Sequence, residues 1–268
     1  MKSLTLTVIT LLLLSMNLHA KERKLIWSDE FNDGTLPSTE KWHYQTGGHG
    51  WGNKELQFYT DRRNENANAY IKDGKLIIEA RKEAYKDMTY TSARLNSNAN
   101  WTYGSFVIRA KLPDMVGTWP AIWMMPNEST YGRWPKSGEI DIMEHLGRMK
   151  NSIHCTLHTE AANHMVGNQR TAITKVDTAT TEFHEYRVDW TPEGIAGFVD
   201  NEQYFFAENE SISDPEKGHA YWPYDQPFHL ILNLAVGGNW GGDVDPNWKP
   251  QRMEIDYIHV YEFVDNKK

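Results

Sequence analysis

The sequence predicts an all-β domain, a sandwich or a barrel, and three observations lead to this fold class. Short runs rich in β-branched and aromatic residues recur along the chain. Turn-forming residues separate these runs, and no stretch shows long helical periodicity. Many short strands joined by regular turns are typical of β-sandwiches and β-barrels. We therefore expect one β-domain with a sizeable core.

The predicted strands follow one another along the chain with turns between them. Residues 75–80, Lys-Leu-Ile-Ile-Glu-Ala, are the first run rich in β-forming side chains. Residues 197–205 predict a hairpin that turns at Asp200-Asn201, because Asn and Asp tolerate the backbone of tight hairpin turns. Turn signals also occur at Asp73-Gly74, at Pro113-Asp114 and at 247–250. The further predicted strands are 105–112, 139–146, 152–158, 184–190, 228–236 and 252–263.

Length and charge limit the domain organisation and the partners. The chain has 268 residues, and we expect residues 21–263 to form one domain, followed by a short polar tail at 264–268. The formal net charge of −8 argues against a nucleic-acid partner, which would require a basic patch. The one cysteine, Cys155, lies in a predicted strand and cannot form an internal disulfide, so we expect a buried, inert thiol.

The first 20 residues have the pattern of a signal peptide. Lys2 supplies the positive start, residues 4–16 form an apolar run, and Leu18-His19-Ala20 offers a cleavage point. The run is short for a membrane span, although a short membrane anchor is the alternative. We expect a secreted protein, extracellular or periplasmic, with no membrane span in its mature form. We also expect a monomer.

The most informative segment is an acidic strand that begins at Glu139. Side chains alternate between the two faces of a strand, so Glu139 and Asp141 share one face. Ile140 and Ile142 share the other face, which we expect to lie in the core. Strict alternation would also place Glu144 in the core, where an unpaired carboxylate is costly. A one-residue bulge near Met143 would return Glu144 to the acidic face.

Carboxyl groups gathered on one face of a strand are compatible with a catalytic site, with a metal site, or with a solvent-exposed acidic edge that has no function. A retaining glycosidase needs two carboxyl groups roughly 5–5.5 Å apart, one as nucleophile and one as acid/base. Glu139 and Glu144 fit these roles, and Asp141 between them would help keep one carboxyl ionised and the other protonated. A metal site or a solvated acidic edge would show the same pattern.

Several separate segments resemble glycoside hydrolase family 16. Glu-Ile-Asp-Ile-Met-Glu at 139–144 is similar to the catalytic signature of that family, in the bulged form with two residues between Asp and the second Glu. The segment Gly-Gly-His-Gly-Trp-Gly-Asn-Lys-Glu-Leu-Gln at 47–57 is similar to one typical of its bacterial laminarinases, which are endo-β-1,3-glucanases. Further matching segments, in the same order as in the family, are 27–31, 90–95, 117–124 and 232–240.

The resemblance implies both a fold and a set of catalytic roles. The fold would be a jelly-roll β-sandwich with an open concave substrate cleft. Glu139 would be the nucleophile, Glu144 the acid/base and Asp141 their helper. The reaction would be a double displacement through a glycosyl-enzyme on Glu139, with retention of configuration. No cofactor is expected for catalysis.

Aromatic residues near the acidic strand are candidates for sugar binding. The chain contains 11 Trp and 13 Tyr, and the C–H faces of glucose pack on aromatic rings. Trp119, Trp123 and Trp134 flank the strand in sequence, but Trp123 lies in an apolar stretch and would also suit the core. The resemblance favours Trp119 and Trp134, and it implies that Asn53 and Arg94 bind sugar hydroxyls on the non-reducing side.

Two histidines lie on the strand that follows the acidic one. His154 and His158 are four residues apart and therefore share a face. This spacing would suit a metal pair, but no third ligand is evident. For His158 we favour a hydrogen bond to a catalytic group or to substrate, with a core histidine as the alternative.

The resemblance also implies a structural Ca²⁺, which many family members hold on the convex side, away from the cleft. The matching side chains are Glu30 and Asp256, together with a backbone oxygen near Gly74. Oxygen ligands suit Ca²⁺, although the spacing of these residues alone would not have indicated the site.

These observations predict a polysaccharide-cleaving enzyme whose partner is a β-glucan substrate. We expect cleavage of internal β-1,3 bonds of laminarin-type glucans. A mixed-linkage β-1,3-1,4-glucanase or a galactan-cleaving relative is the alternative among enzymes. The unbulged spacing typical of lichenases is absent. A noncatalytic β-glucan-binding protein is the alternative outside enzymes, although such relatives usually lose the catalytic glutamates that are present in this chain.

Overall fold

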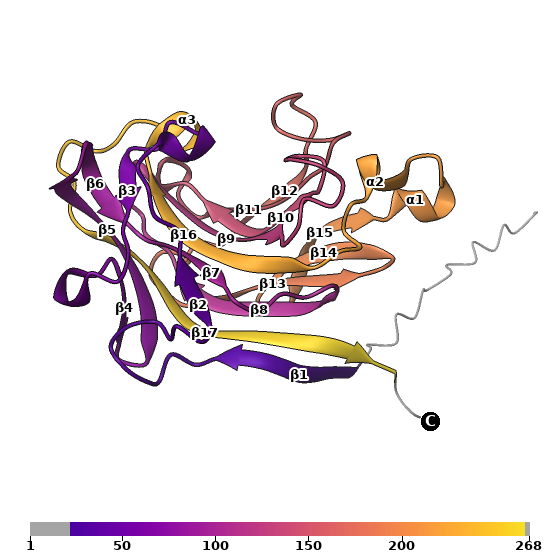
Figure 1. The fold of residues 1–268 in the computed structure, drawn as a ribbon, viewed down its shortest axis with the longest axis horizontal. Helices are drawn as coiled ribbons and strands as arrows, with labels where there is room; N and C mark the ends of the chain where they lie inside the picture. Colours follow the sequence, from indigo (N-terminus) through magenta and orange to yellow (C-terminus); the bar gives the residue numbers. More distant parts are fainter. Residues whose placement is uncertain (1–21, 266–268) are drawn as a thin grey trace, which may run out of the picture.

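The computed structural model describes residues 22–265 and contains two curved β-sheets packed face to face (Figure 1). The all-β prediction is confirmed, and the chain forms the sandwich rather than the barrel. The predicted signal peptide, residues 1–20, lies outside the described residues, as do the last three residues of the predicted tail. The last strand ends at Val264, one residue beyond the predicted domain end.

The larger sheet has ten strands, and its central strand is β17 (Gln251–Val264), which pairs with β5, β8 and β1. The other nine strands are β1 (Glu22–Asp29), β3 (Gln57–Tyr59), β4 (Ala69–Lys72), β5 (Lys75–Tyr85), β6 (Met88–Ser92), β8 (Gly104–Lys111), β13 (His184–Thr191), β14 (Gly194–Val199) and β15 (Glu202–Glu208). The predicted hairpin joins β14 to β15, and Asp200 and Asn201 take φ values of 48° and 70° at its turn.

The smaller sheet has seven strands in the order β12-β11-β10-β9-β16-β7-β2. Figure 1 shows this sheet curving so that its concave face is turned away from the ten-stranded sheet, with loops rising on both sides. Its strands are β2 (Trp42–Tyr44), β7 (Arg94–Ser97), β9 (Thr118–Pro126), β10 (Glu139–His145), β11 (Ser152–His158), β12 (Arg170–Lys175) and β16 (Phe228–Val236).

Helical structure is short in the described part of the chain, as the sequence predicts. The α-helices α1 (Glu210–Ser213), α2 (Gly218–Tyr221) and α3 (Gly238–Gly241) have four residues each, and η1 (Gly50–Gly52), η2 (Asn64–Asn66) and η3 (Gly147–Met149) are single 3-10 turns. Among residues 22–265, no helix has the length and apolar character needed to span a bilayer.

The core lies between the two sheets and consists of alternate side chains from both. Ile108 of β8 and Ile140 of β10 are fully buried there. Cys155 is also fully buried, as predicted, and burial raises the pKa of its thiol, which disfavours the reactive thiolate. Gly197 on β14 faces this thiol, and a Cβ atom at that position would lie 2.8 Å from Sγ. The packing of β14 on β11 therefore requires a residue without a side chain there.

Strand pairing arranges the concave face in rows. One row contains Trp123 on β9, Asp141 on β10 and Thr156 on β11. In the next, Arg94 on β7 pairs with Asn233 on β16. Residues directly opposite each other on antiparallel strands share a face. Residues far apart in sequence are therefore brought side by side on the concave face.

Candidate active site

The acidic strand β10 contains the predicted bulge. Asp141 and Glu144 both pair with β11, but the register shifts between them, so that Ile142 and Met143 lie opposite the single residue Cys155. The register with β9 shifts in the same place. The extra residue resets the alternation. As a result Glu144 shares the concave face with Asp141, while Ile142 and Met143 are both buried in the core.

Each predicted catalytic glutamate accepts a hydrogen bond from a tryptophan. Nε1 of Trp119, on β9, donates to Oε1 of Glu144 at 3.0 Å. Nε1 of Trp134, in the loop before β10, donates to Oε2 of Glu139 at 2.6 Å. An indole N–H can only donate, so each bond favours the ionised carboxylate over the neutral acid. Both tryptophans therefore contact the groups that the sequence assigns to the chemistry.

His158 lies against the two carboxylates at the start of β10. It pairs with Glu139 across the strands, and its Nε2 is 3.4 Å from Oδ2 of Asp141. One ligand atom from each of Glu139, Asp141 and His158 lies within 4.8 Å of the others, and no other such group occurs among residues 22–265. His154 lies further along β11, opposite Glu144 and edge-on to Trp240. His158 therefore lies beside Glu139 and Asp141, whereas His154 lies beside Glu144 at the other end of the acidic group.

Burial and mutual repulsion act on the three carboxyl groups of β10. Burial, reinforced by the charge of Asp141, raises the pKa of Glu139 to about 8. Burial raises the pKa of Asp141 to about 7, and it raises the pKa of Glu144 well above its usual range with help from both neighbours. The cluster therefore retains protons near neutral pH, which a general acid requires.

The residues expected to bind sugar lie beside this cluster. The guanidinium of Arg94 is sandwiched between two rings, 4.8 Å from the centroid of Trp51 and 4.7 Å from that of Trp123. Trp123 itself pairs with Asp141 and is partly exposed, so it belongs to the concave face and not to the core. Asn53 precedes β3, and its backbone oxygen accepts a hydrogen bond of 2.7 Å from the amide of Asn239.

Four further residues contact the site but were not singled out from the sequence. The ring of Trp240 lies edge-on to Trp119, at 5.3 Å between centroids. The buried hydroxyl of Tyr224 donates to the backbone oxygen of His158 at 2.9 Å and so helps hold β11 in place. Trp51 and Trp240 lie within the matching segments 47–57 and 232–240. Their position in those segments was the sequence signal that could have identified them as site residues.

His164 is the fourth of these residues, and it lies in the loop that follows β11. Its ring centroid is 4.9 Å from that of Trp134 and 5.3 Å from that of His158. A histidine in a polar loop shows no periodicity that would predict this position.

The residues of the predicted calcium site have other partners. Asp256 forms an ion pair with Arg109, and Oε1 of Glu30 lies 2.6 Å from Nε2 of His259. Gly74 forms the turn between β4 and β5. A bound Ca²⁺ would have to displace Arg109 and His259, so the residues as arranged do not form an oxygen cage. Calcium binding stays a prediction.

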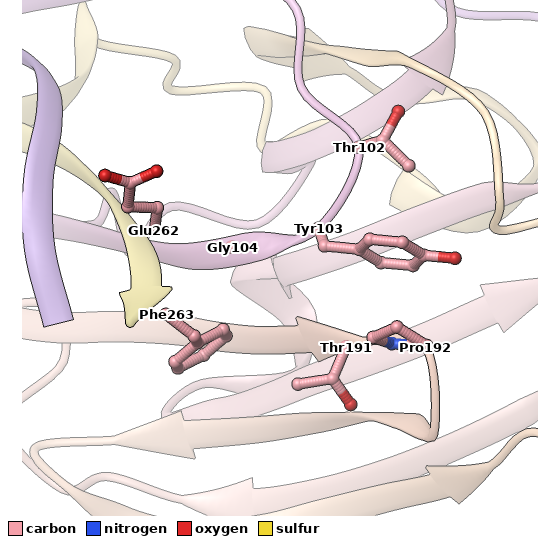
Figure 2. A pocket seen from close by; sticks show the side chains of 7 residues that line it. All are labelled: Thr102, Tyr103, Gly104, Thr191, Pro192, Glu262 and Phe263. Carbon is pink, nitrogen blue, oxygen red and sulfur yellow. The ribbon is translucent and has the colours of Figure 1, made fainter. Parts of the chain in front are cut away.

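A separate pocket lies at the ends of β8, β13 and β17, on the ten-stranded sheet (Figure 2). None of the predicted site residues lines it, and Glu262 at its edge forms an exposed ion pair with Lys24. The lining residues are Thr102, Tyr103, Gly104, Thr191, Pro192, Glu262 and Phe263.

Comparison with known proteins agrees with this geometry. Residues 54–259 match the family model of Glycosyl hydrolases family 16. The chain is 54% identical over 248 residues to a beta-glucanase of Rhodothermus marinus, covering 90% of this chain and 86% of the relative. It is 41% identical to a glucan endo-1,3-beta-glucosidase of Cryptopygus antarcticus, covering 87% and 90% of the two chains.

Solved structures show the same fold. The laminarinase of Rhodothermus marinus superposes with a TM-score of 0.89 at 52% identity, covering 92% of this chain and all of that one. SCLam, described as a non-specific endo-beta-1,3(4)-glucanase, superposes with a TM-score of 0.83 at 40% identity, covering 90% and 92%.

Proposed function

The chain belongs to glycosyl hydrolase family 16 and is a glycoside hydrolase, and we propose that it cleaves internal β-1,3-glucosidic bonds of laminarin-type β-glucans with retention of configuration. One observation carries the proposal: the bulge in β10 places Glu139, Asp141 and Glu144 on the concave face, and a tryptophan N–H contacts each glutamate. Two carboxyl groups on one face are the minimal apparatus for this reaction. Family 16 enzymes need no catalytic cofactor.

In the first step the carboxylate of Glu139 attacks the anomeric carbon of the sugar at the scissile bond. The glycosidic oxygen takes the proton of Glu144 as the C–O bond breaks, and the leaving chain departs with a free hydroxyl. The raised pKa of Glu144 supports its role as the proton donor, because that carboxyl stays protonated near neutral pH. The product of this step is a glycosyl ester on Glu139.

In the second step Glu144, now ionised, takes a proton from a water molecule. The water oxygen attacks the anomeric carbon and displaces Glu139 as a carboxylate. Two inversions at the same carbon give net retention. Glu144 is protonated again at the end, so the cycle is closed without any other proton source.

Asp141 supports the nucleophile by sharing a proton with it. Burial and the charge of Asp141 raise the pKa of Glu139, and a hydrogen bond joins the two side chains, so a proton can lie on either carboxyl group. The Trp134 N–H is directed at Glu139 and favours the negative charge on that residue. With the proton on Asp141, Glu139 is free to attack, and Asp141 can hydrogen-bond the carboxylate when it leaves.

The choice of a β-1,3-glucan is supported by the aromatic and polar groups beside the cluster. Trp119 and Trp134 lie against the two ends of the acidic pair, and the Arg94–Trp123 stack lies to one side. If these rings meet the bound chain at an angle, they would suit the curved β-1,3-glucan better than straight cellulose. The relatives named as endo-1,3-glucanases point the same way. The similarity to a non-specific endo-β-1,3(4)-glucanase makes mixed-linkage glucan the second candidate substrate.

We also propose that the protein is secreted and acts as a monomer. The pattern of residues 1–20 is the support for secretion. Sequencing the amino terminus of the protein recovered from the culture medium or the periplasm would test it. A start near Lys21 is the expected result, whereas retention of Met1 in the exported protein would contradict it.

The substrate is tested by comparing four polysaccharides. Purified enzyme is incubated with laminarin, barley mixed-linkage glucan, cellulose and agarose, and new reducing ends are measured together with product length. We expect rapid shortening of laminarin, weaker action on mixed-linkage glucan and none on cellulose. Proton NMR of the first products should show the β-anomer. An enzyme that leaves laminarin intact but depolymerises agarose would overturn the proposal.

A further inference from the structure

A buried carboxylate outside the catalytic cluster is held by three donors. Glu55, just before β3, is 6% exposed. Its Oε2 accepts hydrogen bonds from Gln57 Nε2 at 2.6 Å and from the Tyr59 hydroxyl at 3.1 Å, and its Oε1 accepts from Asn53 Nδ2 at 3.3 Å. Glu55, Gln57 and Tyr59 alternate along the chain and therefore point to the same side. None of the catalytic steps uses this carboxylate.

A chain of hydrogen bonds ends at Glu55, and its direction is fixed by chemistry. The indole of Trp123 can only donate, so Asn233 must present its oxygen, which lies 2.7 Å from Trp123 Nε1. The amide nitrogen of Asn233 then faces the Tyr59 hydroxyl at 3.0 Å, and that hydroxyl must direct its proton to Glu55. Every member of the chain donates toward Glu55. Burial raises the pKa of Glu55, but its three hydrogen-bond donors and the charge of Arg94 oppose that effect. Because all three neighbours donate, an ionised carboxylate is the natural terminal acceptor, and a neutral acid would place its own proton among donors.

The same carboxylate acts electrostatically on a cation of the concave face, Arg94. The Arg94 guanidinium is held between the rings of Trp51 and Trp123, and its Nε is buried without a hydrogen-bond partner. Burial lowers the pKa of Arg94, whereas the nearby acidic groups, Tyr59, Glu55 and Glu139, oppose that effect. A guanidinium stacked on two rings has its donors free at the edge of the stack. Such donors suit the hydroxyl groups of a sugar.

We propose that Glu55 is a positioning residue for substrate: as a buried anion it ends the hydrogen-bond chain from Trp123, holds the Asn53 amide, and balances the charge of Arg94. These three residues then form one pre-arranged platform for the glucose units beside the cut. The inference rests on the proposed function, because it assigns the platform to the glucan that the enzyme cleaves. Pre-arranged groups bind more tightly since less freedom is lost on binding.

A purely structural role is the competing explanation, and the chain offers a matched control for it. Glu79 is 5% exposed and, like Glu55, accepts a hydrogen bond from a tyrosine, Tyr70, at 3.0 Å. It lies on β5 of the ten-stranded sheet, between Arg81 and Arg252, whereas the catalytic strand belongs to the other sheet. Both residues are buried glutamates in hydrogen-bond networks, but only Glu55 connects to the concave face.

The test compares Glu55→Gln with Glu79→Gln. Thermal unfolding, kcat and KM are measured for both, with a laminarin-derived hexasaccharide as substrate. For Glu55→Gln we expect KM to rise about tenfold with kcat within about threefold of the parent, because binding groups are displaced while the catalytic strand is kept. For Glu79→Gln we expect a lower melting temperature and an unchanged KM. Glu55→Gln that loses only melting temperature, as Glu79→Gln does, would overturn the proposal.

Two further variants keep the test decisive. Tyr59→Phe breaks the hydrogen-bond chain one step before Glu55 and leaves the ring packing intact, so it should also raise KM even where Glu55→Gln does not fold. In an Arg94→Ala background, Glu55→Gln should raise KM far less than it does in the wild-type background. The Arg94 guanidinium, one of the groups through which Glu55 acts on the substrate, is already absent there. Full additivity of the two changes would contradict a role that acts through Arg94.

Failure of the substrate proposal would give a different result. If wild-type enzyme does not cut laminarin, the same variants are measured on whichever of the four polysaccharides it does cut. The KM effect of Glu55→Gln relative to Glu79→Gln then still decides the role of Glu55, independently of the linkage.

Discussion

The two sheets bury glutamates to nearly the same extent and treat them in opposite ways. Glu79, on the ten-stranded sheet, is 5% exposed, and Glu144, on the seven-stranded sheet, is 8% exposed. Burial alone would raise the pKa of Glu79, but Arg81 and Arg252 hold it below its usual range. Burial raises the pKa of Glu144 well above its usual range, and the charges of its neighbouring carboxyl groups increase the effect.

The difference shows that burial does not decide what a carboxyl group does. Two arginines beside Glu79 keep it charged, and the resulting ion pairs tie β5 to β17. The carboxyl groups of β10 have tryptophan donors and one another instead, so they hold protons that can be transferred. One cluster contributes to stability, and the other keeps a costly arrangement that the reaction uses.

The largest expected effect is the loss of activity on changing Glu139, which a change at Glu79 should not cause. Glu139→Gln removes the attacking charge with little change in shape, and turnover should fall by on the order of 10⁴-fold. Glu79→Gln should keep turnover close to that of the parent at a temperature where it is folded. Initial rates on laminarin, with circular dichroism to check folding, measure both. Near-native turnover of Glu139→Gln on every glucan tested would show that the nucleophile lies elsewhere.

Glu144→Ala tests the acid/base within the catalytic cluster. Turnover should fall by about 10²–10⁴-fold, and least for substrates with good leaving groups, which need little protonation. Added azide should restore the second step by attacking the glycosyl-enzyme. The product should be a β-glycosyl azide, which NMR identifies. An α-linked azide would instead mean that the roles or the stereochemistry are assigned wrongly.

Trp134→Phe sharpens the comparison by removing one N–H donor while keeping an aromatic ring. The N–H favours the ionised form of Glu139, so its loss should raise the pKa of that carboxyl further. The acidic limb of the kcat/KM profile should shift to higher pH, with roughly a tenfold loss of kcat/KM below neutral pH. Trp119→Phe, which acts on Glu144, is the matched variant. It should leave the acidic limb in place.

Stability should depend on pH with opposite sign for the two clusters. The folded pKa of Glu139 is about 8, above its unfolded value, so the folded state gains stability from protonation that is lost as pH rises toward 8. Glu139→Gln should therefore melt increasingly higher than the parent as pH rises from about 5 to 8. Glu79 has a lowered pKa and stabilises the protein above its unfolded pKa.

Glu79→Gln should accordingly lower the melting temperature at neutral pH, and the loss should shrink as pH falls below about 4. Scanning calorimetry of both variants at several pH values gives the two trends. Parallel trends would contradict the contrast between the clusters.

The smallest expected effect concerns calcium. If Ca²⁺ binds at Glu30 and Asp256, a chelator should lower the melting temperature by mass action on the folded state. Catalysis at low temperature should change little, because the site lies away from the concave face. Glu30→Gln should melt like the chelated parent and should not respond to the chelator. An unchanged melting temperature after chelation would show that the folded protein is not stabilised by bound Ca²⁺.

Much of the fold could be predicted because its signals are local. The seven predicted strands all occur, since alternation and turn residues act over a few positions. Several strands were not predicted, and β9 is the one nearest the site; Pro120 explains that omission, because proline weighs against a central strand. In the structure Pro120 pairs with Leu234 on β16 but lies beyond the pairing with β10, which begins at Ala121. Its missing N–H therefore costs no hydrogen bond to β10.

The site residues could be predicted where they lie on a single strand or within a motif of the family. The bulge followed from the cost of burying Glu144 unpaired, and the register confirms it. The bonds from Trp119 and Trp134 join segments that sequence spacing does not place in contact. The Glu55 network was missed, although Glu55, Gln57 and Tyr59 alternate on one side of a short strand. Their partner Asn233 lies 174 residues from Tyr59, and only the folded sheet brings it near.

The bulge in β10 also bears on how such a strand could change by insertion or deletion. With two residues between Asp141 and Glu144, the second glutamate reaches the concave face only because one residue is left out of the ladder. Deleting Met143 would leave one residue between the two acids, and plain alternation would then keep both on the same face. Insertion or deletion of a single codon could thus convert a regular strand into a bulged one, or the reverse, without changing the order of the acidic residues. Loss of both intervening codons would make the two acids adjacent, and plain alternation would then place one carboxylate against the core.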